Sequence, residues 1–423
     1  MTDSSNTETL AGIAKEIYPV EEIAAMEQTM TTFWKEIPEG KGLEYSPLDG
    51  GKFKFPVKAS GPHGQKMMNE REGLPNPRSS RVVQGESYIK EYAGVLQFTK
   101  RELELAKKSP QAFATAKTFE MANLIENAYK YFNRQVANGN GTGVITTVTV
   151  AGSGVPELTV ADATPFQINM VCDIFNAAGT KIFSEVVVED IDYLTDPDAH
   201  VVTFDQDITS AVDVDSKIYI AGVNDNAATD GKEMIGLPLV YDDGSEYAEF
   251  QGIVRSGANE VPNYRGITVD ADGAPLSPQL INQLMTRAKR IGGVDFEGSS
   301  DAYWLFSPEQ WRVYASLAIP LVRYMPSDSP DQNKMISQKE CAGKRVVEDT
   351  DVSRNAITII KKSTALEKAM PVPLDWESDL GGTSLKWLSG SLQGVMVLYA
   401  LAQMFSRKPR DLAAVTNLET VAI

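Results

Sequence analysis

The sequence predicts an α+β fold that carries an additional small β-barrel or β-sandwich. One helical pattern continues without a break over residues 110–137. Short strand-like runs with a period of two follow between residues 144 and 226. Beyond them, strands and helices are segregated and show no regular crossovers, which argues against a parallel α/β sheet.

The composition is that of a folded protein with a surplus of acidic side chains. The 423 residues include 40 Lys and Arg against 57 Asp and Glu, a net charge of −17, and 42% are apolar. This length favours two or more packed units, and the apolar content argues against disorder. The net acidity argues against a protein that coats nucleic acid over its whole surface, but it leaves room for a local basic patch.

Cysteine content and hydropathy predict a soluble protein of a reducing compartment. Cys172 and Cys341 are the only cysteines, so no disulfide framework is expected. The N-terminus has no basic segment followed by an apolar one, so we expect no secretion signal. The most apolar late stretch, residues 394–402, is far shorter than the roughly 20 residues of a membrane span.

The motif search gives no positive indication of an enzyme, and we expect no catalytic residue, cofactor or bound metal. His63 and His200 are isolated, and no metalloprotease or hydrolase motif is present. The run 139–143 is rich in glycine, but it lacks the Walker lysine and follows a helix. Paired carboxylates that meet only in space stay open. Four aspartates offer oxygen ligands for calcium without the full calcium-loop pattern, so we favour solvated turns: Asp190, Asp192, Asp196 and Asp198.

The first hundred residues predict two arms. Residues 1–38 show helical amphipathicity that is interrupted at Pro19, as expected of an arm that needs a partner surface. Residues 53–57 alternate like a strand, and residues 88–98 form a second extended stretch. The segment between them is rich in Gly, Pro and polar residues, which predicts a long two-stranded arm with a mobile tip.

The predicted two-stranded arm is basic. Between residues 50 and 81 seven cations face Glu70 and Glu72, so seven minus two gives +5. One interpretation is a solvated loop, and the other is a surface that docks on an acidic neighbour. The candidate contact residues are Lys52, Lys54, Lys58, Lys66, Arg71, Arg78 and Arg81.

A long helix and an acidic β region come next. Ser109 as N-cap, Pro110 at the first helical position and Gly139 as a stop predict a helix of about 42 Å. Residues 144–226 read as a domain inserted between glycine- and asparagine-rich hinges. Fourteen carboxylates there face only Lys181 and Lys217, so this region carries −12 of the net charge.

The remaining chain alternates between strands and helices. Residues 235–254 show a strand pattern, a loop at Asp242–Gly244 and another short strand, and residues 304–306 and 356–360 are further strands. Helical patterns cover 280–291 and a segment that starts at Ser307. The last 40 residues, from Ser384, alternate apolar and small residues as strands do.

Taken in order, these segments resemble the major capsid proteins of tailed bacteriophages, which share the Hong Kong 97-like fold. The resemblance rests on the long helix that ends in Asn138–Gly143, on Gly236–Ser256, on Trp304–Trp311 and on Phe405–Asn417. It implies an N-terminal arm (1–38), an extended β-hairpin loop (39–100), the spine helix of a peripheral domain (101–143), an inserted β domain (144–226), a peripheral-domain β segment (227–275), an axial domain (276–360) and C-terminal strands of both domains (361–423). The insert is a departure that other family members also show in this place. Encapsulins share the fold but are shorter and lack such inserts.

The resemblance implies a structural protein of the virion that self-assembles, as hexamers and pentamers, into an icosahedral head shell around phage DNA. Its implied partners are other copies of itself, a separate scaffolding protein, a portal, a decoration protein and double-stranded DNA without sequence-specific contacts. Assembly is expected in the host cytoplasm, without a membrane and without covalent crosslinks, and the insert is expected to face outward. The alternatives are another β-rich virion component, such as a tail or decoration protein that binds through the insert, and an unrecognised hydrolase.

Overall fold

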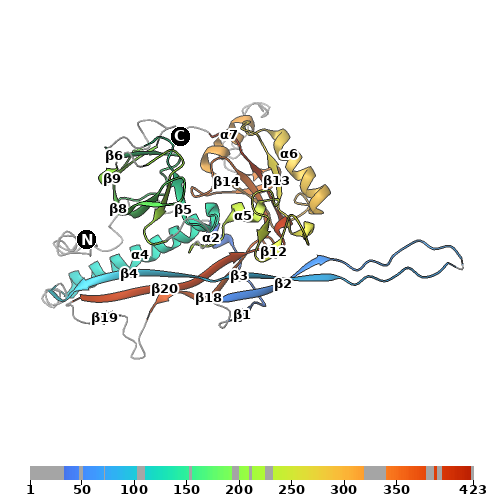
Figure 1. The fold of residues 1–423 in the computed structure, drawn as a ribbon, viewed down its shortest axis with the longest axis horizontal. Helices are drawn as coiled ribbons and strands as arrows, with labels where there is room; N and C mark the ends of the chain where they lie inside the picture. Colours follow the sequence, from blue (N-terminus) through green and yellow to red (C-terminus); the bar gives the residue numbers. More distant parts are fainter. Residues whose placement is uncertain are drawn as a thin grey trace, which may run out of the picture. The chain divides into compact units, whose positions relative to one another are not determined.

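The computed structural model describes residues 33–46, 51–70, 72–101, 110–151, 155–192, 200–208, 212–223, 232–318, 340–377, 385–387 and 393–420 (Figure 1). The chain divides into two compact units. The described part of the first unit lies in residues 90–133 and 370–402, and that of the second lies in residues 33–89, 134–369 and 403–420. Most of the predicted N-terminal arm falls outside the described residues, which begin with α2 (Phe33–Glu36).

The first unit combines most of one long helix with most of a four-stranded sheet; residues 134–138 of the helix and the ends of two strands belong to the second unit. α4 covers Pro110–Asn138, which confirms the predicted helix, and its end is marked by a hydrogen bond from the Gly139 N–H to the Gln135 carbonyl. β4 (Lys90–Thr99) pairs antiparallel with β20 (Gln393–Phe405) over the whole length of β4. β18 (Glu367–Trp376) and β19 (Leu385–Trp387) complete the sheet. The rings of Tyr92 and Phe132, 5.0 Å apart, pack the helix on β4.

The second unit contains a β-hairpin whose second strand was predicted in the wrong place. β2 (Lys52–Ser60) pairs with β1 (Glu44–Ser46) on one side and with β3 (Arg81–Tyr88) on the other. The stretch 88–98 belongs mostly to β4 instead. The inward positions of β3 are the small residues Gly85 and Ser87, so this strand lacks the apolar alternation that reveals a strand in a sequence.

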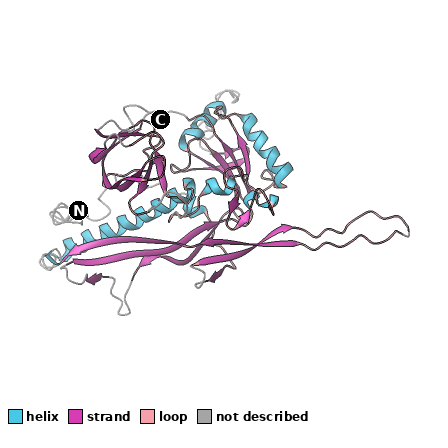
Figure 2. Cartoon of the chain, in the orientation of Figure 1, coloured by secondary structure: helices cyan, strands magenta, loops and turns pink. Residues whose placement is uncertain are grey.

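Residues 144–220 form a closed six-stranded β-barrel (Figure 2). Its strands are β5 (Val144–Thr147), β6 (Val155–Val160), β7 (Val171–Phe175), β8 (Lys181–Asp192), β9 (His200–Ile208) and β10 (Lys217–Ile220), in the order β5-β10-β7-β8-β9-β6. A bridge between Val148 and Val160 joins the two ends of this order, so the sheet closes on itself. Ile174, Val188 and Phe204 lie in its buried core. The four predicted strands are confirmed, and β6 and β7 were missed.

The two chain segments that lead into and out of the barrel are paired, in place of the loose hinges that we expected. Asn140 and Ile235 form an antiparallel bridge. A Cβ on Gly236 would lie 2.1 Å from the Gly139 carbonyl oxygen, and one on Gly143 would lie 2.5 Å from a Val223 methyl group. The glycines therefore permit close packing of the two segments at the base of the barrel.

A second six-stranded sheet with two helices completes the second unit. The strand order is β13 (Ile267–Asp270), β21 (Leu412–Thr416), β17 (Ile357–Lys361), β14 (Ala302–Phe306), β16 (Lys344–Glu348) and β15 (Glu340–Cys341). α6 (Pro278–Arg287) continues into the π-helix η4 (Ala288–Gly292), and α7 (Pro308–Ala318) follows β14. Trp304 and Ile359 are fully buried in its core. The predictions for 280–291, 304–306, 307 onward and 356–360 are confirmed.

Short elements connect the barrel to this sheet: α5 (Leu237–Tyr241), β11 (Glu249–Phe250), β12 (Ile253–Val254) and the 3₁₀ helix η3 (Pro262–Tyr264). A second 3₁₀ helix, η6 (Pro409–Asp411), lies between β20 and β21. The first of the two strands predicted within residues 235–254 is wrong, because residues 237–241 are helical. A short apolar run fits either structure, and Pro238 at the start of α5 favours the helix. No helix among the described residues is both long and apolar enough to cross a membrane.

Candidate assembly surface on the β2–β3 hairpin

The inner face of the β2–β3 hairpin is anchored in the second unit. Phe53, Phe55, Val57 and Ala59 alternate along β2 and are all buried. The rings of Phe53 and Phe55 lie 5.2 and 5.0 Å from the ring of Phe405. This apolar anchor fixes the direction in which the hairpin leaves the unit.

Hydrogen bonds to backbone groups hold both strands of the hairpin in place. The Glu86 N–H donates to the Gln251 carbonyl in the turn between β11 and β12, at 2.9 Å. The Asn263 side chain donates to the Ala59 carbonyl at 2.7 Å. Gly85 lies opposite Phe55, and a Cβ there would come within 2.6 Å of the Phe55 ring. The ring thus occupies the space that a side chain at position 85 would need.

Substituting Gly85→Val is expected to destabilise the second unit by about 1–3 kcal/mol, because the added methyl groups collide with the Phe55 ring in a packed core. Urea unfolding followed by tryptophan fluorescence measures this loss. Gln84→Val is the matched control, since residue 84 is exposed and valine favours strands. Equal stability of the two variants would contradict the assigned packing.

The outer face of β2 carries cations that differ in their surroundings. The Lys52 ammonium lies 2.8 Å from the Glu86 carboxylate and 4.7 Å from the centroid of the Tyr88 ring. Hydrogen bonds to Glu86 and Tyr88 raise the pKa of Lys52. Lys54 is half-buried and Lys58 is exposed. Lys52 is therefore neutralised within the hairpin by Glu86, which lies outside residues 50–81, the segment with the net charge of +5.

The hairpin continues past its regular strands as a two-stranded ribbon, residues 61–80 (Figure 1). His63 and Arg78 exchange two backbone hydrogen bonds, of 3.0 and 2.6 Å, which extend the pairing. Met67 is 100% exposed and Leu74 is 86% exposed. A two-stranded ribbon with its apolar side chains in water has no core of its own to stabilise it.

The ribbon carries further charges. The Lys66 ammonium and the Glu72 carboxylate lie 2.7 Å apart, and both side chains are exposed. The pKa of Glu72 is lowered by this contact first and by the hydrogen bond from the Asn69 N–H second. Arg78 and Arg81 are exposed.

The seven predicted contact residues thus fall into several groups. Lys58, Arg78 and Arg81 are exposed and form no ion pair with any residue that the structure describes. Lys52 and Lys66 have carboxylate partners within the hairpin and its ribbon. Lys54 lies on the outer face of β2 with partners of its own, and Arg71 lies outside the described residues.

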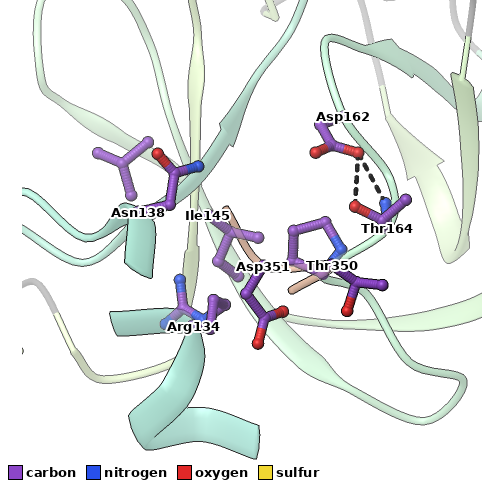
Figure 3. A pocket seen from close by; sticks show the side chains of 9 residues that line it. Arg134, Asn138, Ile145, Asp162, Thr164, Thr350 and Asp351 are labelled. Atoms are coloured by element: carbon purple, nitrogen blue, oxygen red, sulfur yellow. Dashed lines mark hydrogen bonds between the residues drawn. The ribbon is translucent and has the colours of Figure 1, made fainter. Parts of the chain in front are cut away.

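The second unit also has a small cavity at the base of the barrel, which Figure 3 shows from close by. Its volume is about 10 Å³, room for a single water molecule. Arg134 and Asn138 of α4, Ile145 and Asp162 of the barrel region, and Asp351 of a loop in the second unit are among the lining residues. A cavity of this size does not accommodate an organic substrate.

The polar side chains around this cavity have structural roles. The Asp162 carboxylate accepts hydrogen bonds from the Thr164 N–H (3.0 Å) and hydroxyl (2.7 Å), and it lies 3.3 Å from the Arg354 guanidinium. Nδ1 of the buried His200 accepts a hydrogen bond from the Ala163 N–H at 2.9 Å. These contacts cap turns and bind the barrel to the rest of the second unit.

Comparison with known proteins finds similarity in fold but not in sequence. The sequence matches no protein-family model and no curated protein. The fold does match solved capsid structures. The "Cyanophage A-1(L) capsid asymmetric unit" is similar with a TM-score of 0.53 and 12% identity, over 98% of this chain and 99% of that chain. The "Capsid of native GTA particle computed with C5 symmetry" is similar with a TM-score of 0.50 and 8% identity, over 95% and 94%.

The fold class follows from these two likenesses. The chain has a capsid-protein fold of mixed helix and sheet, matched over 95–98% of its length.

Proposed function

We propose that this chain is the major capsid protein of a tailed bacteriophage, with the Hong Kong 97-like fold, and that it self-assembles into the icosahedral shell that encloses the phage DNA. The ribbon of residues 61–80 carries this proposal. It leaves Met67 and Leu74 in water, so a neighbouring copy must supply the surface on which it lies. The end-to-end likeness of fold to capsid proteins supports the same conclusion.

In this proposal the chain is a non-enzymatic building block of the virion. Residues 39–100 are the extended loop, 101–143 contain the spine helix, 276–360 form the axial domain, and 227–275 and 361–423 complete the peripheral domain. Residues 144–226 are an inserted domain that faces outward. The partners are other copies in hexamers and pentamers, a separate scaffolding protein, a portal, a decoration protein and packaged DNA. Each interface of a permanent assembly of this kind buries about 2,000–5,000 Å² of accessible surface.

The exposed cations of the hairpin are the proposed inter-subunit contacts. Lys58, Arg78 and Arg81 are the best placed, because no described carboxylate neutralises them within the subunit. In a chain with a net charge of −17, acidic surface on a neighbouring copy is abundant. Opposite charges across the contact would set its register and make assembly sensitive to salt.

Expression of the whole chain followed by sedimentation velocity tests the proposal, with electron microscopy of the fast-sedimenting fraction. Closed shells, or uniform rings of five or six subunits, are the expected result. Spirals and irregular shells would support the same subunit chemistry in the absence of a scaffolding protein. A monomer or dimer at every protein and salt concentration would overturn the proposal and direct attention to the barrel as a binding module.

The triple variant K58E/R78E/R81E is expected to lower the yield of shells about tenfold or more. Reversing three contact charges needs to weaken the association free energy by only about 1.4 kcal/mol for each factor of ten. The subunit should stay folded, because exposed substitutions usually change stability by no more than about 0.5 kcal/mol. Analytical sedimentation gives the yield and a thermal melt gives the stability. An unchanged yield would remove these three side chains from the contact.

A further inference from the structure

A second group of cations gathers on the second unit, where η4, η3 and η6 meet. The Arg410 guanidinium donates to the carbonyl of Ile291 in η4 at 3.2 Å and to that of Pro262 in η3 at 2.7 Å. Arg410 therefore ties three elements together. Carbonyl acceptors carry no formal charge, so these bonds fix the position of the guanidinium without neutralising it.

Other cations lie on the elements that Arg410 contacts and beside it in the sequence. The pKa of Arg410 is lowered by burial first and by the neighbouring guanidinium of Arg265 second. Arg287 and Arg290 lie within one turn of each other at the junction of α6 and η4, and Lys408 lies two residues before Arg410. We refer to Arg265, Arg287, Arg290, Lys408 and Arg410 as the cationic patch.

The cationic patch has little compensation within the subunit. Arg265 lies 2.7 Å from the Glu260 carboxylate. Arg287, Arg290 and Lys408 are exposed and form no ion pair within the described part of the chain. The chain has a surplus of 17 acidic groups, yet none of the described ones neutralises these three cations. Three exposed cations on adjoining elements, with no ion pair inside the described part of the subunit, point to an anionic partner outside it.

The chemistry of the cationic patch favours phosphate over a protein surface. Protein interfaces are centred on apolar and aromatic side chains. Ile291, 56% exposed, is the one large apolar side chain that is exposed among the described residues of η3, η4 and η6. Four of the five cations are arginines, whose planar guanidinium binds phosphate through two hydrogen bonds. A polymer with regularly spaced phosphates matches this surface.

We propose that the cationic patch binds the phosphate backbone of double-stranded DNA without reading its sequence. The inference rests on the proposed function, because a shell subunit is the setting in which this chain meets duplex DNA. It adds a surface to that function and implies that this face of the subunit points into the shell. Contacts of this kind position the DNA and carry no sequence information.

Fluorescence anisotropy of a labelled duplex of about 30 base pairs, titrated with the whole chain at about 50 to 200 mM NaCl, tests the inference. The wild type is expected to bind with an affinity that falls steeply as salt rises. R287E/R290E should weaken binding at least about tenfold, and K100E/R101E, a matched double reversal of two exposed cations outside both proposed surfaces, should change it less than about twofold. If charge reversal lowers the melting temperature, R287Q/R290Q replaces it, with an expected loss of about threefold.

Sedimentation of the same variants separates this inference from the proposed function. R287E/R290E that still forms shells but has lost duplex binding supports the inference. Wild-type binding by R287E/R290E, an equal loss in K100E/R101E, or no binding by the wild type at the lowest salt would overturn the inference and leave the shell function standing. Polyglutamate that displaces the duplex as effectively as unlabelled DNA does would also overturn the inference. The cationic patch would then bind an acidic protein segment equally well.

Discussion

Replacing residues 61–80 by a two-residue Asn-Gly turn is expected to abolish closed shells and to leave the subunit folded. Ser60 and Arg81 are paired at the end of the regular ladder, so a short turn can join β2 to β3 there. The buried anchor of the hairpin, at Phe53 and Phe55, is untouched by this change. The deleted ribbon contributes no buried apolar side chain to its own subunit.

The measurement combines a thermal melt with sedimentation velocity of the whole chain. We expect the melting temperature to change by no more than about 4 °C, as for a loss below about 1 kcal/mol, and the fast-sedimenting fraction to disappear. A variant with a Gly/Ser segment of the original length is the matched control. This control keeps the length of the ribbon and removes its side chains. If it still forms shells, the contact depends on the backbone of the ribbon and not on its side chains. Normal shells from the shortened variant would show that the ribbon is dispensable.

The elements that the sequence predicted well are those whose signals are local. Ser109, Pro110 and Gly139 predicted the ends of a helix, and the structure places α4 at Pro110–Asn138. The alternation in 185–189 and 201–204 correctly predicted β8 and β9, because one face of each strand is buried in the barrel.

The elements that the sequence did not reveal depend on contacts between distant segments. β3 buries Gly85 and Ser87 beneath the large side chains of β2, so its own residues carry no strand signal. The carbonyl of Leu239 in the helix at residues 237–241 has its donor in Arg255, 16 residues further along the chain, and this contact is not visible in the local sequence.

Only part of the candidate contact surface could be predicted, because it too depends on contacts between distant segments. Seven cations in one segment are visible in a sequence, but their partners are not. Glu86 neutralises Lys52 because the β2–β3 register brings the two strands together. The cationic patch escaped notice because its members come from three separate segments, around residues 265, 290 and 410, and only the fold brings them together.

Substituting Arg255→Leu is expected to destabilise the second unit by about 3–5 kcal/mol, the cost of removing one partner of a buried ion pair. The Arg255 guanidinium lies 3.8 Å from the Asp242 carboxylate, and both side chains are buried. The Arg255 side chain is 0% exposed. Its guanidinium donates to the carbonyls of Leu239 (2.6 Å) and Asp242 (3.2 Å), and it lies 4.1 Å from the centroid of the Phe250 ring. Burial lowers its pKa to about 10, so it remains charged at neutral pH.

The expected loss has a specific cause. Leucine fills part of the volume but leaves the carbonyls at the end of α5 without donors in a dry environment. Phe250 precedes Gln251, whose carbonyl accepts the Glu86 N–H, so loss of Arg255 should also loosen the root of the hairpin. Arg255→Lys keeps the charge but loses the planar fork, and we expect an intermediate loss.

Urea unfolding measures these differences, and hydrogen exchange of the Glu86 amide reports the hairpin root. Arg345→Leu is the matched control: its guanidinium pairs with Glu36 but its side chain is 60% exposed, so the expected loss is below about 1 kcal/mol. A loss of that small size for Arg255→Leu would mean that the carbonyls of α5 find other donors. Unchanged exchange at Glu86 together with a large global loss would separate the buried arginine from the hairpin, and the anchor of the assembly surface would then rest on the aromatic contacts of Phe53 and Phe55 with Phe405 alone.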